Sequence, residues 1–219
     1  MVNTWLDETV FESVDHSIAD SKKRIRDCAP PCVQKRYKKL VNFNQDLPYG
    51  YLLPKRKKQW LLGRTIIAYS ASMVKRLLAI LAKAIQMMIH CTWGVHFGAS
   101  VPLASKAIHT AFKHHDSSRT ILLYNQDLVG FFNSIPQEDI LSSLHALVVE
   151  HTQRHGPIIM VAPPGHLTSG HSAYSRQSCR ANFTRVQTSD IVALVRWSFQ
   201  SNMFTVLNGV HRQVRGTSW

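Results

Sequence analysis

The sequence predicts a mixed α/β (α+β) fold in which helices flank an antiparallel sheet. Apolar residues recur at helical spacing in three stretches, residues 73–91, 136–153 and 190–201. Two short β-rich runs, 65–69 and 121–124, are typical of strands. Residues 203–214 form two strand-like runs around Asn208-Gly209, a dipeptide that favours a type I′ hairpin turn.

Composition and charge favour a polyanionic partner. The chain has 219 residues, 45% of them hydrophobic, which is enough to bury the core of about one domain. The net charge is +13 and the pI about 9.9. Such a balance favours nucleic acid first and an anionic membrane surface second.

We expect neither a membrane-spanning segment nor a signal peptide. The most apolar run, residues 77–89, contains Lys83 and is shorter than the roughly 20 residues that a spanning helix needs. The first eight residues lack a basic start and an apolar centre.

The cysteines do not predict a disulfide framework or a zinc site. The chain has four, and they are scattered. Cys28 and Cys32 have a C-x3-C spacing, but no second ligand pair follows at a spacing typical of zinc.

Residues 1–47 are expected to form a helical and basic N-terminal extension. An amphipathic helix is predicted by apolar residues every three to four positions, namely Trp5, Leu6, Val10, Val14 and Ile18. Basic clusters follow at 22–26 and 35–39, with aromatic residues at Tyr37, Phe43, Tyr49 and Tyr51. This alternation suits a surface that follows a nucleic-acid backbone and stacks bases; the alternative is a solvated helical face followed by a linker.

A β-hairpin with a basic tip is expected next. Lys55, Lys57 and Lys58 precede Arg64, which opens the β-rich run 65–69. Such cations could bind a triphosphate or a template backbone. A helix over residues 73–91, a turn over 92–98 and a second helix over 100–112 follow.

The central stretch joins a strand, a carboxylate and a helix. Residues 121–124 are an apolar run that leads to Asp127. Ser134 is expected to cap the following helix, with Pro136 in its first turn and Gln137 completing a capping box. A carboxylate at the end of a strand suits Mg²⁺ held against phosphates; the alternative is an ordinary turn aspartate.

The last third alternates helices, loops and strands. The helix from Pro136 to about Gln153 is followed by a short strand over 158–161, inside a flexible insertion over 157–187. Thr188 or Ser189 is expected to cap a helix from Asp190 to about Ser201, and the hairpin follows.

The run from Asp127 to Pro136, DLVGFFNSIP, closely resembles the first palm motif of reverse transcriptases. In that family the aspartate begins the metal site, and an aromatic residue five positions later blocks a ribose 2′-OH. The resemblance gives these roles to Asp127 and Phe132.

Two further stretches resemble the same family. Pro54-Lys55 followed by Arg64-Thr65-Ile66 is similar to the fingers, where the arginine contacts the incoming triphosphate; Lys55, Lys57 or Lys58 would assist. Residues 204–217 are similar to the region that enters the second palm motif, most like Penelope-type and telomerase-like relatives. Gln213, Gly216 and Thr217 stand where that region packs under the nucleotide and template base.

The resemblance implies an RNA-directed DNA polymerase of a retroelement, of the Penelope/telomerase-like or non-LTR type. It implies a basic N-terminal extension (1–47), a fingers-like segment (48–118) and an incomplete polymerase palm (119–219). Asp127 would hold Mg²⁺, and the substrate-binding residues would be Arg64, Lys55, Phe132, Gln213, Gly216 and Thr217. The implied partners are an RNA template, a DNA primer and deoxynucleoside triphosphates, with no membrane.

The family's next palm motif, Tyr/Phe-x-Asp-Asp, has no counterpart, because the sequence contains no Asp-Asp pair. We therefore expect a truncated or degenerate copy without polymerase activity of its own, and a sheet with an unpaired edge. The alternatives are a non-catalytic nucleic-acid-binding remnant, an unrelated basic α/β protein, and a fragment completed by a separate C-terminal polypeptide. The cell compartment stays open.

Overall fold

A computed structural model describes residues 9–54, 63–94, 105–106, 109–110, 112–113, 135–164, 170–173, 182–207 and 209–215. The elements in chain order are β1 (Phe11–Val14), α1 (Ile18–Asp27), α2 (Pro31–Lys35), the 3₁₀ turn η2 (Lys38–Leu40), β2 (Tyr49–Pro54), β3 (Gly63–Ala68), α3 (Lys75–Trp93), α6 (Gln137–His155), β4 (Ile158–Val161), β5 (Gly170–Ala173), β6 (Thr184–Gln187), α7 (Thr188–Gln200), β7 (Met203–Val206) and β8 (Gly209–Gln213). The mixed α/β class predicted from the sequence is confirmed.

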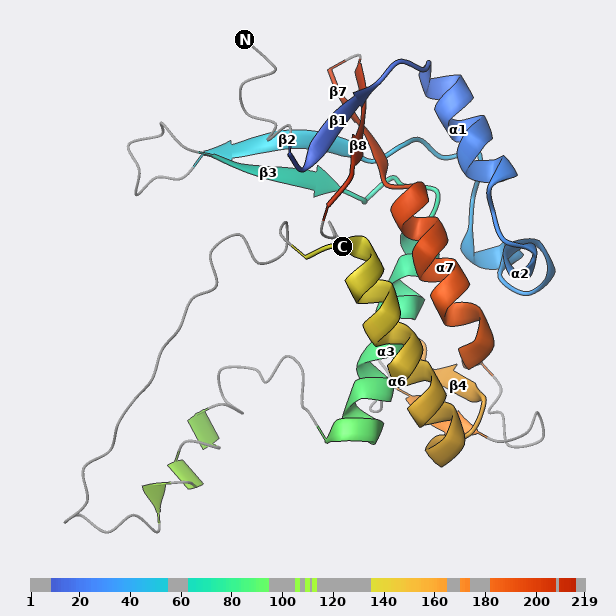
Figure 1. Cartoon of the computed structure of the whole chain (residues 1–219), viewed down its shortest axis with the longest axis vertical. Coiled ribbons are helices and arrows are strands. Elements are labelled where there is room, and N and C mark those ends of the chain that lie inside the picture. Colours follow the sequence, from blue (N-terminus) through green and yellow to red (C-terminus); the bar gives the residue numbers. More distant parts are fainter. Residues whose placement is uncertain are drawn as a thin grey trace.

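A five-stranded sheet has the order β1-β8-β7-β2-β3 (Figure 1). Its two hairpins, β2–β3 and β7–β8, are antiparallel. They meet through a parallel pairing of Tyr49 with Thr205, and Thr205 N donates to Pro48 O at 2.8 Å. The expectation of a purely antiparallel sheet was therefore wrong, since this junction makes the sheet mixed.

A second, three-stranded sheet has the order β5-β4-β6, and both of its pairings are antiparallel. The predicted strand over 158–161 is confirmed and lies at its centre, with all four residues buried. Within the range predicted as a flexible insertion, 157–187, β5 and β6 pair with the two edges of β4. Residues 165–169 and 174–181 of that range lie outside the described part of the chain.

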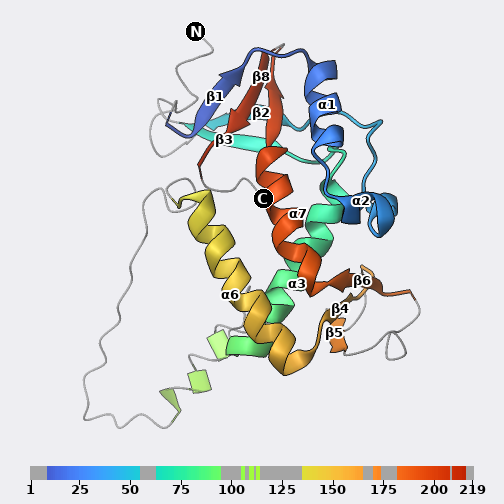
Figure 2. The same cartoon turned by 45° about the vertical axis from the view of Figure 1, so that its right-hand side comes forward.

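Three helices lie between the two sheets (Figure 2). Helix α3 packs against α6 and α7, and α6 packs against α7. Their buried side chains, among them Leu81, Leu144 and Leu194, belong to one apolar core that also takes in residues of α2, β4 and β7. Gly94, in the left-handed conformation at φ 66°, ends α3. The three predicted helices are confirmed to within a few residues.

The amphipathic helix expected from Trp5 to Ile18 was wrong over residues 9–17, which the structure describes. Residues Phe11–Val14 form β1, which pairs with β8 so that Phe11 lies opposite Gln213. The Phe11 ring meets the Phe204 ring edge-on, with centroids 5.5 Å apart. Pairing with a strand some 200 residues away thus outweighs the local helical spacing. Helix α1 begins later, where Ser17 Oγ accepts from Asp20 N at 3.0 Å.

The start of two helices differs from expectation, and the cap expected at Ser134 lies outside the described residues. Helix α6 starts after Pro136 and α7 after Gln187, and neither has a side-chain cap. The first turns make tertiary contacts: Arg196 Nη1 donates to Glu138 Oε1 at 3.1 Å, and Thr188 N donates to Pro157 O at 3.0 Å. The strand predicted over 121–124 lies outside the described residues, as does most of the helix predicted over 100–112.

Candidate nucleic-acid site

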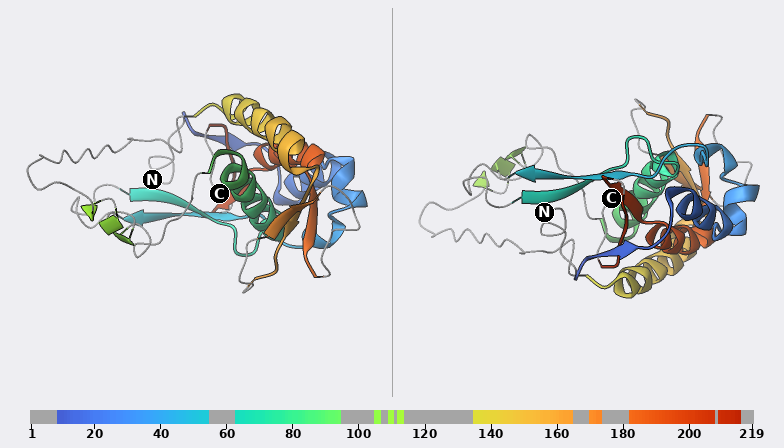
Figure 3. Two further views of the ribbon diagram at one scale, coloured as in Figure 1. Left: turned by 90° about the horizontal axis from the view of Figure 1, so that it is seen from below. Right: turned by 90° about the horizontal axis from the view of Figure 1, so that it is seen from above.

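The sheet brings together two hairpins that are far apart in the sequence. Strand β3 carries Arg64, whose backbone pairs with Leu53 of β2. Strand β8 carries Gln213, and β2 and β7 lie between these two strands. Figure 3 shows that the β2–β3 hairpin projects away from the helices. Two of the segments with which the resemblance builds a nucleotide site therefore belong to one sheet.

Most of the other predicted site residues lie outside the described part of the chain. These residues are Lys55, Asp127, Phe132, Gly216 and Thr217. Of Arg64 only the backbone register is described. The roles that the resemblance gives to these residues stay predictions.

Gln213 is buried in a polar network rather than exposed on the sheet. Its side chain is 2% exposed. Gln213 Oε1 accepts from Asn202 Nδ2 at 3.2 Å, and Gln213 Nε2 donates to Arg215 O at 2.7 Å. In this arrangement Gln213 fixes the backbone that leads toward Gly216 and Thr217.

Sequence reasoning missed the other members of this network. Asn202 is 1% exposed and joins the end of α7 to β7. The Tyr69 hydroxyl, just after β3, donates to Asn202 Oδ1. The network therefore connects both hairpins to the end of α7. Nothing in the local sequence distinguishes Asn202 from a solvated turn residue.

The β2–β3 hairpin exposes an aromatic pair. Tyr49 and Tyr51 are 49% and 43% exposed, and their rings stack with centroids 5.9 Å apart. Tyr49 and Tyr51 share one face of the sheet because the two-residue period of a strand places alternate side chains on the same side. Exposed rings of this kind can stack on unpaired nucleobases.

Carboxylates in the described part of the chain do not form a metal centre. No group of three or more His, Cys, Asp or Glu side chains there could hold a metal ion. Asp190 is buried, but Arg36 Nε donates to its Oδ2 at 2.7 Å and the Tyr37 hydroxyl donates to the same atom at 2.9 Å. Burial, together with the charge of Asp190, raises the pKa of the Tyr37 hydroxyl above its ordinary value. Arg36 Nη2 also donates to Asp190 Oδ1, so both carboxylate oxygens are bonded and the cluster ties α2 to the start of α7.

No known protein family, curated protein or solved structure matches the chain. Within the described residues, no helix is both long and apolar enough to span a bilayer.

Proposed function

We propose that the chain is the fingers and partial palm of a retroelement reverse transcriptase, and that by itself it binds nucleic acid without extending a primer. The observation that supports this most is the junction of the two hairpins in one sheet. The Arg64 strand and the Gln213 strand, about 150 residues apart in sequence, share this sheet.

In the parent enzyme the chemistry would be template-directed DNA synthesis. Mg²⁺, held in part by Asp127, would stabilise negative charge on the reacting phosphates. The cationic Arg64 and Lys55 would bind the triphosphate, and Phe132 would select against ribonucleotides. Because the sequence contains no Asp-Asp pair, and several carboxylates must converge in a two-metal centre, we expect no extension by this chain alone.

The first experiment separates binding from chemistry. The chain is mixed with a fluorescent RNA template annealed to a DNA primer, and anisotropy is measured over a range of salt concentrations. We expect salt-sensitive binding that is unchanged in Asp127→Ala and weaker when Lys55, Lys57 and Lys58 are changed to Ala. Primer extension that disappears in Asp127→Ala would contradict the predicted inactivity, and no binding at low salt would favour an unrelated basic protein.

The second experiment separates polymerase ancestry from simple nucleic-acid binding. The next complementary deoxynucleotide is added with Mg²⁺, and the dissociation rate of the template–primer is measured. We expect slower dissociation with the complementary nucleotide than with a mismatched one, and no such difference in Arg64→Ala. Binding without nucleotide discrimination would favour the second candidate, a non-catalytic remnant, which the exposed Tyr49–Tyr51 stack also supports.

A further inference from the structure

Two adjacent hollows, which together we call the groove, are lined mainly by residues of the N-terminal extension. Its larger hollow has a volume of about 590 Å³ and lies between the end of α1, α2 with η2, and the loop over 41–44. The buried side chains of Val33 and Val41 form an apolar floor. A volume of this order is typical of sites for small organic groups.

One wall of the hollow is a cation–aromatic pair. The Arg26 guanidinium carbon lies 5.5 Å from the centroid of the Phe43 ring. Phe43 is half-buried and packs against the main core, whereas Arg26 is exposed. The pair therefore places an exposed positive charge against an aromatic ring that the core supports.

Polar side chains complete the rim of the same hollow. Lys38, Gln34 and Asn44 line it and are exposed. The loop that carries Asn44 is held in place, because Asn42 N donates to Met73 O at 2.9 Å and Asn44 N donates to Asn42 Oδ1 at 3.2 Å. Amide groups at the rim can donate to and accept from the edge of a planar ring.

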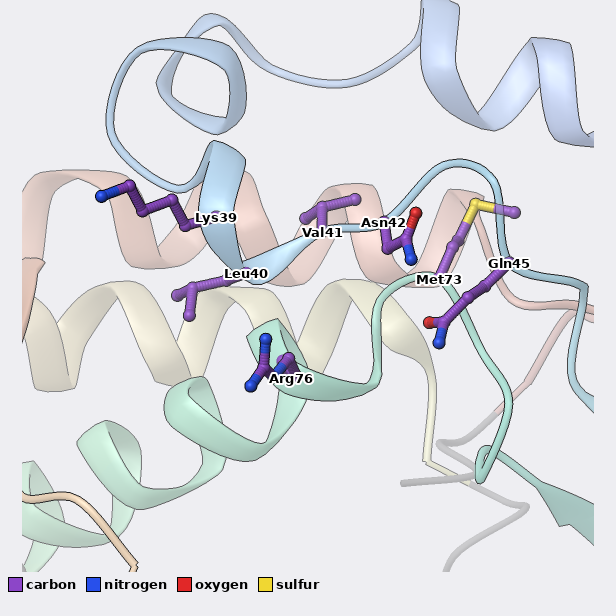
Figure 4. A pocket seen from close by; sticks show the side chains of 7 residues that line it. All are labelled: Lys39, Leu40, Val41, Asn42, Gln45, Met73 and Arg76. Carbon is purple, nitrogen blue, oxygen red and sulfur yellow. The ribbon is translucent and has the colours of Figure 1, made fainter.

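The smaller hollow, of about 160 Å³, reaches the start of α3 and shares Val41 and Asn42 with the first. Lys39 and Arg76, from the start of α3, both line this hollow, and Figure 4 shows Leu40 between them. Among the described residues that line the two hollows, none is acidic. The nearby Asp46 is exposed and pairs with Lys22 at 3.4 Å.

We propose that this groove binds single-stranded nucleic acid, with one base on the Arg26–Phe43 wall and the flanking phosphates on Lys38, Lys39 and Arg76. An aromatic support, amide groups and a row of cations are the parts that such sites combine. A lipid surface would need only the cations, and a duplex keeps its bases stacked and out of reach. The site is separate from the predicted polymerase site and does not depend on the proposed function.

The test measures anisotropy of 12-nucleotide RNA and DNA strands, and of a duplex of equal length, against the full chain. Phe43→Leu keeps an apolar side chain but removes the ring, and we expect it to weaken single-strand binding about tenfold. Lys38→Gln with Lys39→Gln should reduce the slope of log affinity against log salt by about 1.4, roughly 0.7 for each lost phosphate contact. Lys106→Gln, a lysine outside the groove, is the matched control.

A second variant and a direct readout guard against a folding defect. Asn44→Asp introduces a negative charge at an exposed position without a change of volume, and we expect it to weaken binding while circular dichroism stays unchanged. A strand with 5-iodouridine should crosslink to residues 42–44 on irradiation. The proposal is overturned if Phe43→Leu and Asn44→Asp bind like Lys106→Gln, if the duplex or anionic vesicles bind as tightly as the single strand, or if the crosslinks map elsewhere. If binding is weakened only by substitution of Lys55, Lys57 and Lys58, the groove is not the single-strand site, but the proposed function is unaffected.

Discussion

Two regions of the molecule use similar polar side chains in opposite ways. At the end of the sheet, Gln213, Asn202 and Tyr69 bond to one another, and the two amides are buried. In the N-terminal groove, Arg26, Lys38 and Asn44 are exposed and line a hollow with no acidic wall. An amide that is bonded internally fixes a backbone, whereas an amide or cation facing solvent is available to a ligand. The difference between a structural role and a binding role is therefore set by tertiary placement and not by residue type.

The largest effect on the unfolding free energy is expected from the buried imidazole of His151, whose polar atoms, like those of Gln213 and Asn202, are bonded inside the protein. His151 is fully buried, with Nδ1 3.3 Å from Thr92 Oγ1 and Nε2 3.2 Å from Ser172 Oγ. Burial, reinforced by the nearby His155, lowers the pKa of His151 from its ordinary 6.5 to about 4. Below pH 6.5 the unfolded chain binds a proton at His151 that the folded chain excludes. The contribution of His151 to the unfolding free energy is therefore fully present above pH 6.5 and is lost as the pH falls toward 4.

This loss amounts to about 3 kcal/mol of unfolding free energy for His151. Urea denaturation at pH 7, 5.5 and 4 measures it. His151→Gln keeps hydrogen-bonding capacity without a titrating ring, so its stability should vary less over this range. An equal pH dependence in the variant would assign the effect to other groups, such as His211, whose pKa burial also lowers.

The next largest effect on the unfolding free energy is expected at Gly50, where two strands approach closely at the junction of the two hairpins. A Cβ added at Gly50 of β2 would lie 2.8 Å from Phe204 Cδ2 and 3.0 Å from Val206 Cγ2. Phe204 is fully buried, so its ring has no room to move. We expect Gly50→Ala to cost about 2 to 3 kcal/mol in denaturant unfolding.

Gly209→Ala is the matched control for that substitution, because its added Cβ would come no closer than 3.3 Å to His211 Nε2. Equal costs at Gly50 and Gly209 would mean that the β2–β7 contact is looser than described.

Gln213→Leu tests the network at the sheet end. It removes the acceptor of Asn202 Nδ2 and the donor to Arg215 O in a buried setting, and we expect a cost of about 2 kcal/mol. Single-strand binding by the folded variant should equal that of the wild type, because Gln213 does not line the groove. Weaker binding at full stability would instead make Gln213 a ligand contact, as the resemblance predicts.

A smaller effect of opposite sign is expected at the tip of the β7–β8 hairpin. Leu207 has φ 52°, a left-handed conformation that costs an L-residue roughly 1–2 kcal/mol, and its side chain is 76% exposed. Leu207→Asn should therefore raise the unfolding free energy by about 1 kcal/mol, since asparagine tolerates this conformation. Leu207→Ala keeps the strain and should change little; an equal gain from alanine would rule out backbone strain as the cause.

The turn between β7 and β8 shows what a local sequence pattern can and cannot predict. The hairpin over 203–214 was predicted from Asn208-Gly209, but Gly209 pairs with Val206 and so belongs to β8. The prediction of Gly209 as a central turn residue was therefore wrong, and Asn208 lies outside the described residues. Register is set by which side chains each face buries, and here Phe204 and Val206 are buried.

Elements with strong local periodicity were predictable, and elements that depend on distant partners were not. The apolar residues of α3 and α6 repeat clearly enough to locate both helices. By contrast, β1 exists through its pairing with β8, and β5 and β6 exist through β4. The basic and aromatic residues of 22–51 predicted a nucleic-acid surface, but only the fold places Phe43 beside Arg26 and brings Lys39 and Arg76 to the same hollow.

The smallest effect on stability is expected in the groove. Lys38 and Lys39 are exposed, and the described residues that line the two hollows offer them no carboxylate. Lys38→Gln with Lys39→Gln should therefore change the unfolding free energy by less than about 0.5 kcal/mol, or raise it slightly by relieving repulsion between like charges. Denaturation and strand binding measured on the same sample give both numbers. A loss of 2 kcal/mol or more in the unfolding free energy would mean that these lysines, like Gln213, stabilise the fold. Unchanged stability with weaker strand binding is the result expected if they bind a ligand.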